Sequence, residues 1–382
     1  MRILRLLHRW SGGFIGLLLA VLGFTGALLV HEDAFLRATV PHAADVQRQD
    51  TATLAAAATR IFAAQDRPRS IVLATERKGL HKLSYPGETQ KGAYADQDGA
   101  VVQAWTSKWT RPEVWLFDVH HHLLAGDAGD IVGGIAGLAG LGFVITGLIL
   151  WWPTRRMFQL RAWPRAMKRP AIVHHHRDLG VLVAPLLILS LTTGATMNLK
   201  WFSQALRAPF SSPATMDKAS AAPKIKGGKL AADLDWNKVI GQAQARFPGA
   251  EVRTIGLPAK SGGLIAIRLR QQPEWLTNGR TMAWFDPATG AMVASRDAQA
   301  MPLGSRITNA DFPLHAAKVG GLAYRLVMTV SGLALTLLGS LAVVTFWGNP
   351  SGLPKRRKKK AAAPPKAKTE PRPQPKPEPV EA

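Results

Sequence analysis

The sequence predicts a membrane protein whose fold is an all-α bundle of four transmembrane helices, joined to two small α+β domains on one side of the bilayer. Three observations lead to this prediction. The 382-residue chain has four long apolar runs, basic segments flank those runs, and motifs near the first two runs recur near the last two.

Each apolar run is free of charged residues and is long enough to cross about 30 Å of hydrocarbon at about 1.5 Å per residue. The runs are Gly13–Val30, Ile131–Trp152, Leu179–Leu199 and Leu326–Trp347. They predict transmembrane segments at residues 12–31, 130–152, 179–200 and 319–348. The first run follows a basic start, but its 18 residues exceed a usual signal-peptide core, so we interpret it as a retained span.

The formal net charge of +23 is concentrated beside the spans. Residues 351–382 hold ten Lys and Arg against three acids, and residues 153–178 hold seven against one. Residues 31–129, in contrast, hold eleven basic against twelve acidic residues. Charge arranged in this way sets membrane orientation and argues against a nucleic-acid partner.

Basic flanks face the cytoplasm in the bacterial inner membrane. We therefore expect the N-terminal segment 1–11, the loop 153–178 and the tail 349–382 to be cytoplasmic, which makes residues 32–129 and 201–318 periplasmic. The tail is rich in Lys, Pro and Ala, so it is expected to be disordered, either as a solvated topology anchor or in contact with anionic membrane lipid.

Two sequence offsets indicate an internal duplication. An offset of 168 aligns HRWSG at residues 8–12 with HRDLG at residues 176–180, and Thr25-Gly26 with Thr193-Gly194. An offset of 195 aligns His120 with His315, Gly126 with Gly321, and Trp152 with Trp347. The chain thus consists of two successive units, each with a helix, a domain and a second helix. This order predicts a bundle in which the two units are parallel and related by a pseudo-twofold axis. The spaced pairs Gly12/Gly16 and Gly133/Gly137 either pack helices closely or leave room for a flat macrocycle.

The histidines are the candidate ligands for any metal or redox cofactor, because the chain has no cysteine for disulfides, thiolate zinc sites or iron–sulfur clusters. Nine of the eleven histidines lie near a predicted membrane boundary. The cytoplasmic group is His8, His174, His175 and His176, and the periplasmic group is His31, His120, His121, His122 and His315. Each group draws on at least two helices, as axial ligation of a b-type haem by two imidazoles requires.

The repeat selects the expected ligands. His8 and His176 are assigned to a cytoplasmic-side haem, and His31, His120 and His315 to a periplasmic-side haem, so that one or two haems b bind. His121, His122, His174 and His175 remain possible ligands or supporting residues. His8 and His31 are 23 residues apart, about 34 Å along a helix, and must serve opposite faces. Arg9, Arg177 and Arg325 are candidate partners of haem propionates.

Residues 233–300 predict a helix followed by antiparallel strands, with a hairpin turn in FDPATG, and residues 53–105 a looser version with a hairpin at DQDG. Neither domain shows a nucleophile with its base, so we expect substrate or partner presentation there rather than catalysis.

The segments LHRWSGGFIGLLLAVLGFTGALL, HHHLLAGDAG, LWWPTRR, HRDLG and PLHAAKVGG together resemble the PepSY-associated transmembrane family, over about residues 1–348. The region DWNKVIGQAQARFPGA…FDPATG resembles a PepSY domain, whereas the first such region is degenerate. The family includes iron-regulated inner-membrane proteins and ferric-siderophore reductases that hold haem between their helices. The resemblance places the family's pre-helix histidines at His8, His120, His176 and His315.

The leading hypothesis is a haem-containing electron-transfer protein that reduces a periplasmic ferric chelate. The cytoplasmic loop is too short for a nicotinamide or flavin domain, so the electrons are expected from an external donor, either quinol or a partner protein. The alternative is a non-enzymatic PepSY protein that binds or regulates a periplasmic partner such as a peptidase, with the histidines as interfacial caps. A divalent-metal transporter is a third hypothesis, although its ligands would be expected near the apolar midplane.

Overall fold

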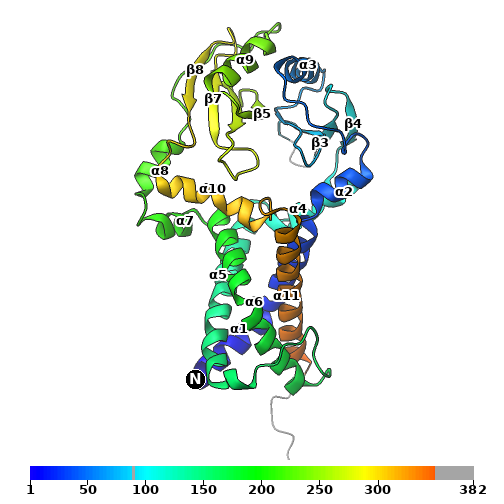
Figure 1. Ribbon diagram of the computed structural model, residues 1–382, viewed down its shortest axis with the longest axis vertical. Helices are drawn as coiled ribbons and strands as arrows, with labels where there is room; N and C mark the ends of the chain where they lie inside the picture. Colours follow the sequence, from blue (N-terminus) through cyan, green and yellow to red (C-terminus); the bar gives the residue numbers. More distant parts are fainter. Residues whose placement is uncertain (88–90, 349–382) are drawn as a thin grey trace, which may run out of the picture.

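The computed structural model describes residues 1–87 and 91–348 and shows a stalk of four long helices that carries a mixed helix and sheet head (Figure 1). The four stalk helices are α1 (Arg2–Leu29), α5 (Asp127–Trp151), α6 (Arg169–Asn198) and α11 (Gly321–Trp347). All four are long and apolar enough to cross a membrane, which confirms the four predicted spans. The tail at 349–382, expected to be disordered, lies outside the described residues.

Helix α6 begins ten residues before the predicted start of the third span, at Arg169 rather than at residue 179. Pro170 occupies its first turn, where the fixed φ of proline suits a helix start. The histidine triplet at 174–176 is therefore helical and lies within the bundle's end rather than in a loop before it.

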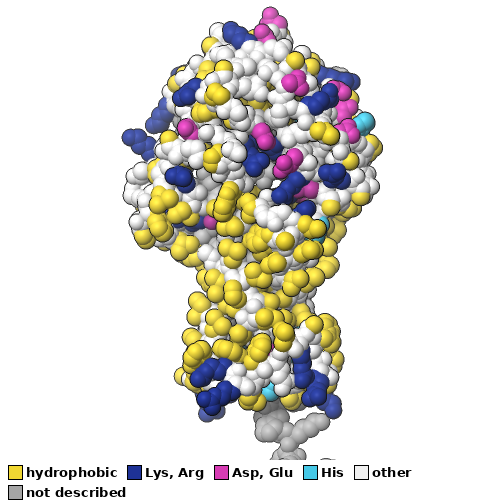
Figure 2. All heavy atoms as spheres, in the orientation of Figure 1, with side chains coloured by type: hydrophobic (Ala, Val, Ile, Leu, Met, Phe, Trp, Pro, Cys, Tyr) yellow, Lys and Arg dark blue, Asp and Glu magenta, His cyan; other side chains and the backbone are white. Residues whose placement is uncertain are grey.

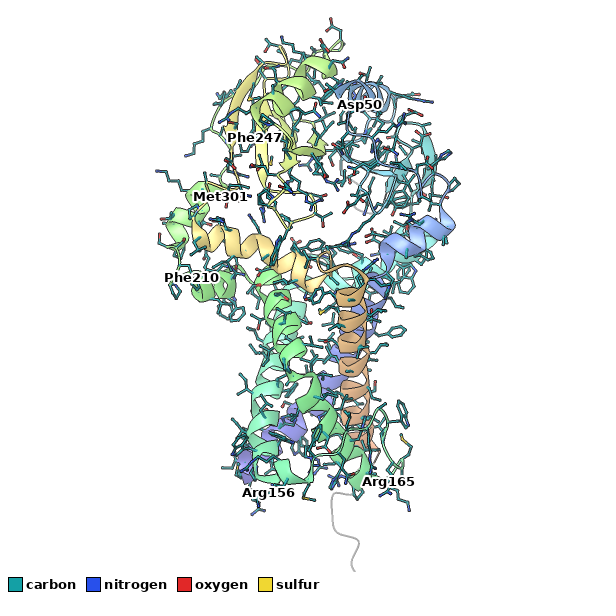
Figure 3. All side chains as sticks on the ribbon, in the orientation of Figure 1. Asp50, Arg156, Arg165, Phe210, Phe247 and Met301 are labelled. Atoms are coloured by element: carbon teal, nitrogen blue, oxygen red, sulfur yellow. The ribbon has the colours of Figure 1, made fainter. Side chains whose placement is uncertain are left out.

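The face of the stalk seen in Figure 2 is an apolar band with basic residues at the end away from the head. Arg156 and Arg165 both lie at that end (Figure 3). Apolar side chains such as Phe14, Ile135 and Leu333 are more than 45% exposed, as expected for groups that face lipid. The structure is that of a multi-pass membrane protein, while its orientation in the bilayer stays a prediction.

The head contains one continuous antiparallel sheet of eight strands in the order β4-β3-β2-β1-β5-β6-β7-β8. The strands are β1 (Ser70–Val72), β2 (His81–Ser84), β3 (Gly92–Ala95), β4 (Val101–Trp105), β5 (Glu251–Gly256), β6 (Ile265–Arg270), β7 (Thr281–Phe285) and β8 (Met292–Arg296). The pairing of Ile71 with Ile255 joins the two four-stranded halves. The two predicted domains are thus fused through one sheet.

Two helices cover one face of this sheet, and each follows a capped start. Asp50 accepts a hydrogen bond from the Thr53 amide at the start of α3 (Thr51–Phe62), and Asp235 accepts one from the Lys238 amide at the start of α9 (Trp236–Arg246). The two helices pack on each other and share one buried core with inward residues of both sheet halves. The first half, which looked degenerate in sequence, therefore has the same helix and four strands as the second.

Shorter helices connect the head to the stalk. They are α2 (Glu32–Thr39), α4 (Pro112–His122), α7 (Lys200–Arg207), α8 (Pro213–Ser220) and α10 (Leu303–His315), with a 3₁₀ turn at Lys108–Thr110. A second 3₁₀ turn, Trp152–Met157, follows α5 at the end of the stalk away from the head (Figure 3). Helices α4 and α10 lie across the head end of the stalk (Figure 1). The chain turns from each of these helices toward the next span through residues with positive φ. These residues are Leu123 and Leu124 after α4, and Ala317 after α10. The element order of the two halves is closely similar, while duplication as their origin stays a prediction.

Candidate functional site

Two pairs of histidines face each other at the two ends of the bundle. At the end away from the head, the rings of His8 on α1 and His176 on α6 have centroids 6.3 Å apart and are nearly perpendicular, at 86°. At the head end, His120 on α4 and His315 on α10 have ring centroids 6.0 Å apart, at 46°. Two imidazoles that share one metal ion through bonds of about 2 Å have ring centroids about 6 Å apart. Both spacings suit such a pair.

Threonines hold three of these four rings in one tautomer. Thr146 Oγ1 lies 2.8 Å from His8 Nδ1, Thr25 Oγ1 lies 3.0 Å from His120 Nδ1, and Thr193 Oγ1 lies 3.1 Å from His315 Nδ1. Each threonine hydroxyl already donates to the carbonyl four residues earlier in its own helix. The threonine oxygen must therefore accept, so the histidine carries its proton on Nδ1 and the Nε2 lone pair is free for a metal.

Burial favours the neutral, ligating form of the head-end pair. It lowers the pKa of His120 to about 3, and the nearby His315 ring adds to this effect. Burial also lowers the pKa of His315, against a smaller opposite effect from the Ser190 carbonyl that accepts its Nδ1 proton at 3.0 Å. Both imidazoles are uncharged at neutral pH, as metal coordination requires.

The two pairs lie far apart along α1. His8 belongs to one pair and Thr25, which holds His120, belongs to the other, and the 17 residues between them span about 25 Å. That length is most of the hydrocarbon thickness of a bilayer, about 30 Å. The two imidazole pairs therefore lie at opposite ends of the bundle, separated by a length close to that thickness.

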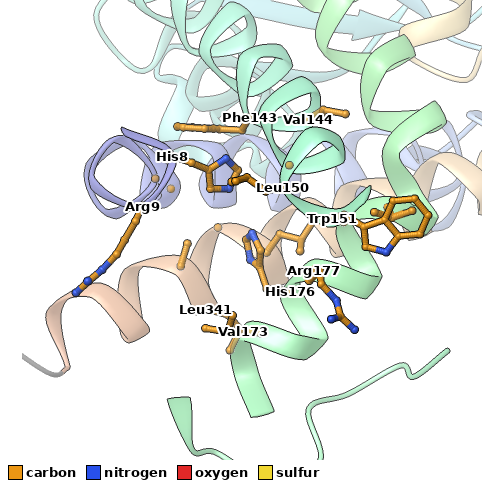
Figure 4. A pocket seen from close by; sticks show the side chains of 18 of the residues that line it. His8, Arg9, Phe143, Val144, Leu150, Trp151, Val173, His176, Arg177 and Leu341 are labelled. Carbon is orange, nitrogen blue, oxygen red and sulfur yellow. The ribbon is translucent and has the colours of Figure 1, made fainter. Parts of the chain in front are cut away.

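A cavity of about 490 Å³ opens beside His8 and His176, within the range of about 300–1,000 Å³ usual for small-molecule and cofactor sites (Figure 4). Its wall is largely apolar, with Phe143 and Trp151 near the histidines. Basic residues border it, namely Arg5, Arg9, Arg169 and Arg177. An apolar cavity with two facing imidazoles and a basic rim has the donor set and the charge that a planar, dianionic macrocycle needs.

The glycines serve the two purposes that the sequence left open, close helix packing and room for a flat macrocycle. Gly16 and Gly339 pack α1 on α11, because a Cβ on Gly16 would lie 2.9 Å from the Gly339 carbonyl oxygen. Gly12, in contrast, lines the cavity, and an added Cβ there would meet nothing within 4 Å. Gly133 and Gly137 face α6, where an added Cβ would make ordinary contacts with Asn198 and Ala195.

The other predicted site residues lie elsewhere. The Nε2 atom of His31 donates to Thr329 Oγ1 at 2.8 Å, so this ring has the tautomer opposite to that of the paired histidines. His174 is exposed at the cavity rim, and His175 is buried with no hydrogen bond to its Nε2 within the described residues. His121 and His122 contact each other and Asp130 instead of the His120–His315 pair.

The candidate propionate partners also differ from one another. The Arg177 guanidinium donates to Asp178 Oδ1 at 2.7 Å and to the Met157 carbonyl at 2.9 Å, so its charge is already paired. Arg9 borders the cavity and stacks over Phe346, at 5.7 Å from its centroid. Arg325 is half-buried on α11, where its Nε donates to the Gly321 carbonyl at 3.4 Å.

Sequence reasoning missed the residues that position the rings. The threonine–glycine match at Thr25 and Thr193 was visible, but its role follows only from the contacts. Gly26 and Gly194 lie against His120 and His315, where an added Cβ would come within 2.8 and 3.0 Å of the imidazole Cε1 atoms. The third acceptor, Thr146, is also followed by a glycine.

A buried ion pair fixes α10 one turn before His315. Arg207 Nη2 on α7 donates to Asp311 Oδ2, and Thr196 on α6 donates to the same oxygen at 3.0 Å. The Arg207 side chain is also bound to the Ser203 carbonyl at 3.1 Å. This network ties the helix that carries His315 to α6, which carries its acceptor Thr193.

The fold and the paired histidines define a multi-pass membrane protein with imidazole pairs at both ends of a four-helix bundle and a sheet-containing head. Comparison with family models matches residues 5–349 to the PepSY-associated TM region. The chain belongs to that family, which confirms the resemblance found in the sequence. A comparison with curated proteins found no match.

Proposed function

We propose that the chain is a haem-containing electron-transfer protein of the bacterial inner membrane that reduces a periplasmic ferric chelate of the siderophore class. The observation that carries the proposal is the facing of His8 with His176 and of His120 with His315 at opposite ends of the bundle. These pairs would each hold one b-type haem through Nε2, and the haem supplies reversible one-electron chemistry.

The protein's own residues set the conditions for that chemistry. Thr146, Thr25 and Thr193 accept the Nδ1 protons and so orient three of the four ligand rings. The apolar bundle excludes water, and Arg5 and Arg9 offer positive charge at the cavity rim. The electrons come from an external donor, quinol or a partner protein, and a ferric chelate that takes up one electron becomes a ferrous chelate that holds iron less tightly.

A basic face of the head supports an anionic substrate. Ile267 and Leu269 of β6 point into the core, so Arg268 between them lies on the opposite face of the sheet. Burial, with Arg280 adding to it, lowers the pKa values of Arg268 and Arg296. The buried Nε atoms of Arg280 and Arg296 make no hydrogen bond within the described part of the chain. Arg280 also borders a cavity of about 130 Å³ with residues of α10, the helix that ends at His315.

An absorption spectrum of the full-length protein, purified in detergent from cells fed with a haem precursor, tests the proposal. We expect a sharp α-band after reduction with dithionite and a ratio of two haems per chain. A well-folded sample without that band would reject the proposal and favour the alternative, a PepSY head that binds a periplasmic partner. With haem present, Arg280→Gln should raise the KM for an anionic ferric chelate without changing the haem ratio.

A further inference from the structure

A second group of ligand atoms lies beside the head-end histidine pair but outside it. His121 Nδ1 and His122 Nδ1, at the end of α4, are 3.4 Å apart. Asp130 Oδ1, in the first turn of α5, lies 3.3 Å from the first and 2.6 Å from the second. We refer to His121, His122 and Asp130 as the outer triad. All three side chains are between one quarter and about one third exposed, so an ion from solvent can reach them.

The spacing of the outer triad suits one metal ion. The three atoms lie on a circle of about 1.8 Å radius, so an ion about 2.1 Å from each would sit about 1 Å out of their plane. The triad would then occupy one face of the coordination sphere and leave the other positions to water or a chelate. Two imidazoles and one carboxylate in a facial arrangement select divalent first-row ions, ferrous iron among them.

The second half of the chain shows that the fold does not need these residues. The offset of 195 that aligns His120 with His315 places Ala316, Ala317 and Arg325 at the positions of the triad. That half also turns into α11 through a left-handed residue, Ala317. A histidine pair with an aspartate is therefore not a requirement of the turn, and its presence in one half alone points to a separate role.

Neighbouring groups hold the triad in place. The ring of Phe117 stacks on His121 at 5.2 Å and 16°, and lies edge-on to His122 at 6.1 Å. Gly129 has no side chain where a Cβ would collide with the His122 carbonyl, so the end of α4 approaches the first turn of α5. Asn198 on α6 donates to the Asp130 carbonyl at 3.1 Å. The ligand atoms are thus supported from three helices before any ion binds.

We propose that His121, His122 and Asp130 form a binding site for a divalent first-row transition-metal ion at the head end of the bundle, separate from the His120–His315 pair. Ion binding displaces the Nδ1 proton that His122 shares with Asp130. That the natural ion is ferrous iron rests on the proposed function, because reduction of a ferric chelate at the neighbouring pair releases that ion next to the triad. The site itself follows from the triad alone.

The test uses the full-length protein in detergent, stripped with a chelator and titrated with Co²⁺ by calorimetry and elemental analysis. We expect one Co²⁺ per chain, and at least a tenfold weaker affinity in Asp130→Asn and in the double variant His121→Ala/His122→Ala, which copies Ala316-Ala317 of the second half. The matched control removes the exposed His42–Asp45 pair, whose atoms are 3.0 Å apart, and should leave Co²⁺ binding unchanged.

The haem α-band of the same samples separates this proposal from the previous one. Co²⁺ binding that Asp130→Asn abolishes in a chain without haem would support the metal site and reject the haem proposal. A native chain that takes up no Co²⁺, or triad variants that bind it as tightly as the native chain, would overturn the metal site whatever the haem content. Displacement of the Co²⁺ by excess Fe²⁺ without oxygen supports ferrous iron as the ion, and failure of that displacement rejects it.

Discussion

Gly26 on α1 lies directly against the imidazole of His120 on α4, where an added Cβ would come within 2.8 Å of Cε1. Gly26→Val should therefore push this ring away from His315. We expect loss of the head-end haem and retention of the haem at His8 and His176, measured as a halved haem ratio. Gly142→Ala is the control, because a Cβ there meets nothing within 4 Å and should leave the ratio unchanged.

Substitution of either histidine tests the pair at the end of the bundle away from the head. His8→Ala or His176→Ala deletes one of two rings whose centroids are 6.3 Å apart, so each should lose the haem away from the head and spare the other. Haem ratio and the spectrum of the remaining haem are the measurements. His174→Ala, two residues before His176 and exposed at the rim, should keep both haems. If His174→Ala lost a haem instead, the ligand in the triplet would be His174 rather than His176.

Loss of the threonine acceptors should weaken the ligands without deleting them. Thr25→Val removes the oxygen that accepts the Nδ1 proton of His120, and loss of such a supporting partner typically weakens metal binding about 10–100-fold. We expect faster haem dissociation and a shifted midpoint potential at the head end alone. Thr25→Ser keeps the hydroxyl and should restore both values. Equal behaviour of the Val and Ser variants would show that the hydrogen bond has no role.

The Arg207–Asp311 pair should be a strong determinant of stability. Asp311→Ala leaves a buried guanidinium without its carboxylate, and breaking one side of such a pair costs about 3–5 kcal/mol. We expect a large drop in thermal stability and weaker haem retention at His315. The double variant Arg207→Met/Asp311→Leu removes both charges and should recover part of the loss. The exposed Lys200–Asp217 pair offers the control, since Asp217→Ala should change stability little.

His81 should make the head sensitive to acid. Burial lowers its pKa to about 4, while its Nδ1 accepts the Ala74 amide proton at 3.0 Å. A histidine with a lowered folded-state pKa favours the folded state fully above pH 6.5, and this stability is lost as the pH falls from 6.5 to about 4, by up to about 1.4 kcal/mol per pH unit. Chemical denaturation at several pH values, followed by tryptophan fluorescence, measures the slope. His81→Leu should flatten it in that window.

The spans and the histidine pairing were predictable because both depend on short-range patterns. Length and hydropathy define a membrane helix, and the aligned motifs selected His8 with His176 and His120 with His315. His31 was grouped with the head-end pair by its place in the sequence, whereas its hydrogen bond to Thr329 depends on how α1 packs on α11. The spacing of residues along the sequence does not reveal how these two helices pack.

The sheet and the outer triad were harder to predict for a physical reason. Strand β1 has only three residues, too few for a clear alternation, and its partner β5 lies more than 170 residues further along the chain. The outer triad depends on the left-handed turn at Leu123 and Leu124, which folds Asp130 back onto His122. Non-glycine residues with positive φ give little local signal.

Tyr94 on β3 donates to Glu113 on α4 at 3.2 Å, and Arg111 holds the same carboxylate at 2.8 Å. The sheet is therefore joined to α4, which carries His120, and β8 leads through the six-residue connection 297–302 into α10, which ends at His315. We therefore expect that a ligand which draws the strands together would shift α4 and α10, and with them the facing rings. Ligand binding on the head is then expected to change the spacing of His120 and His315.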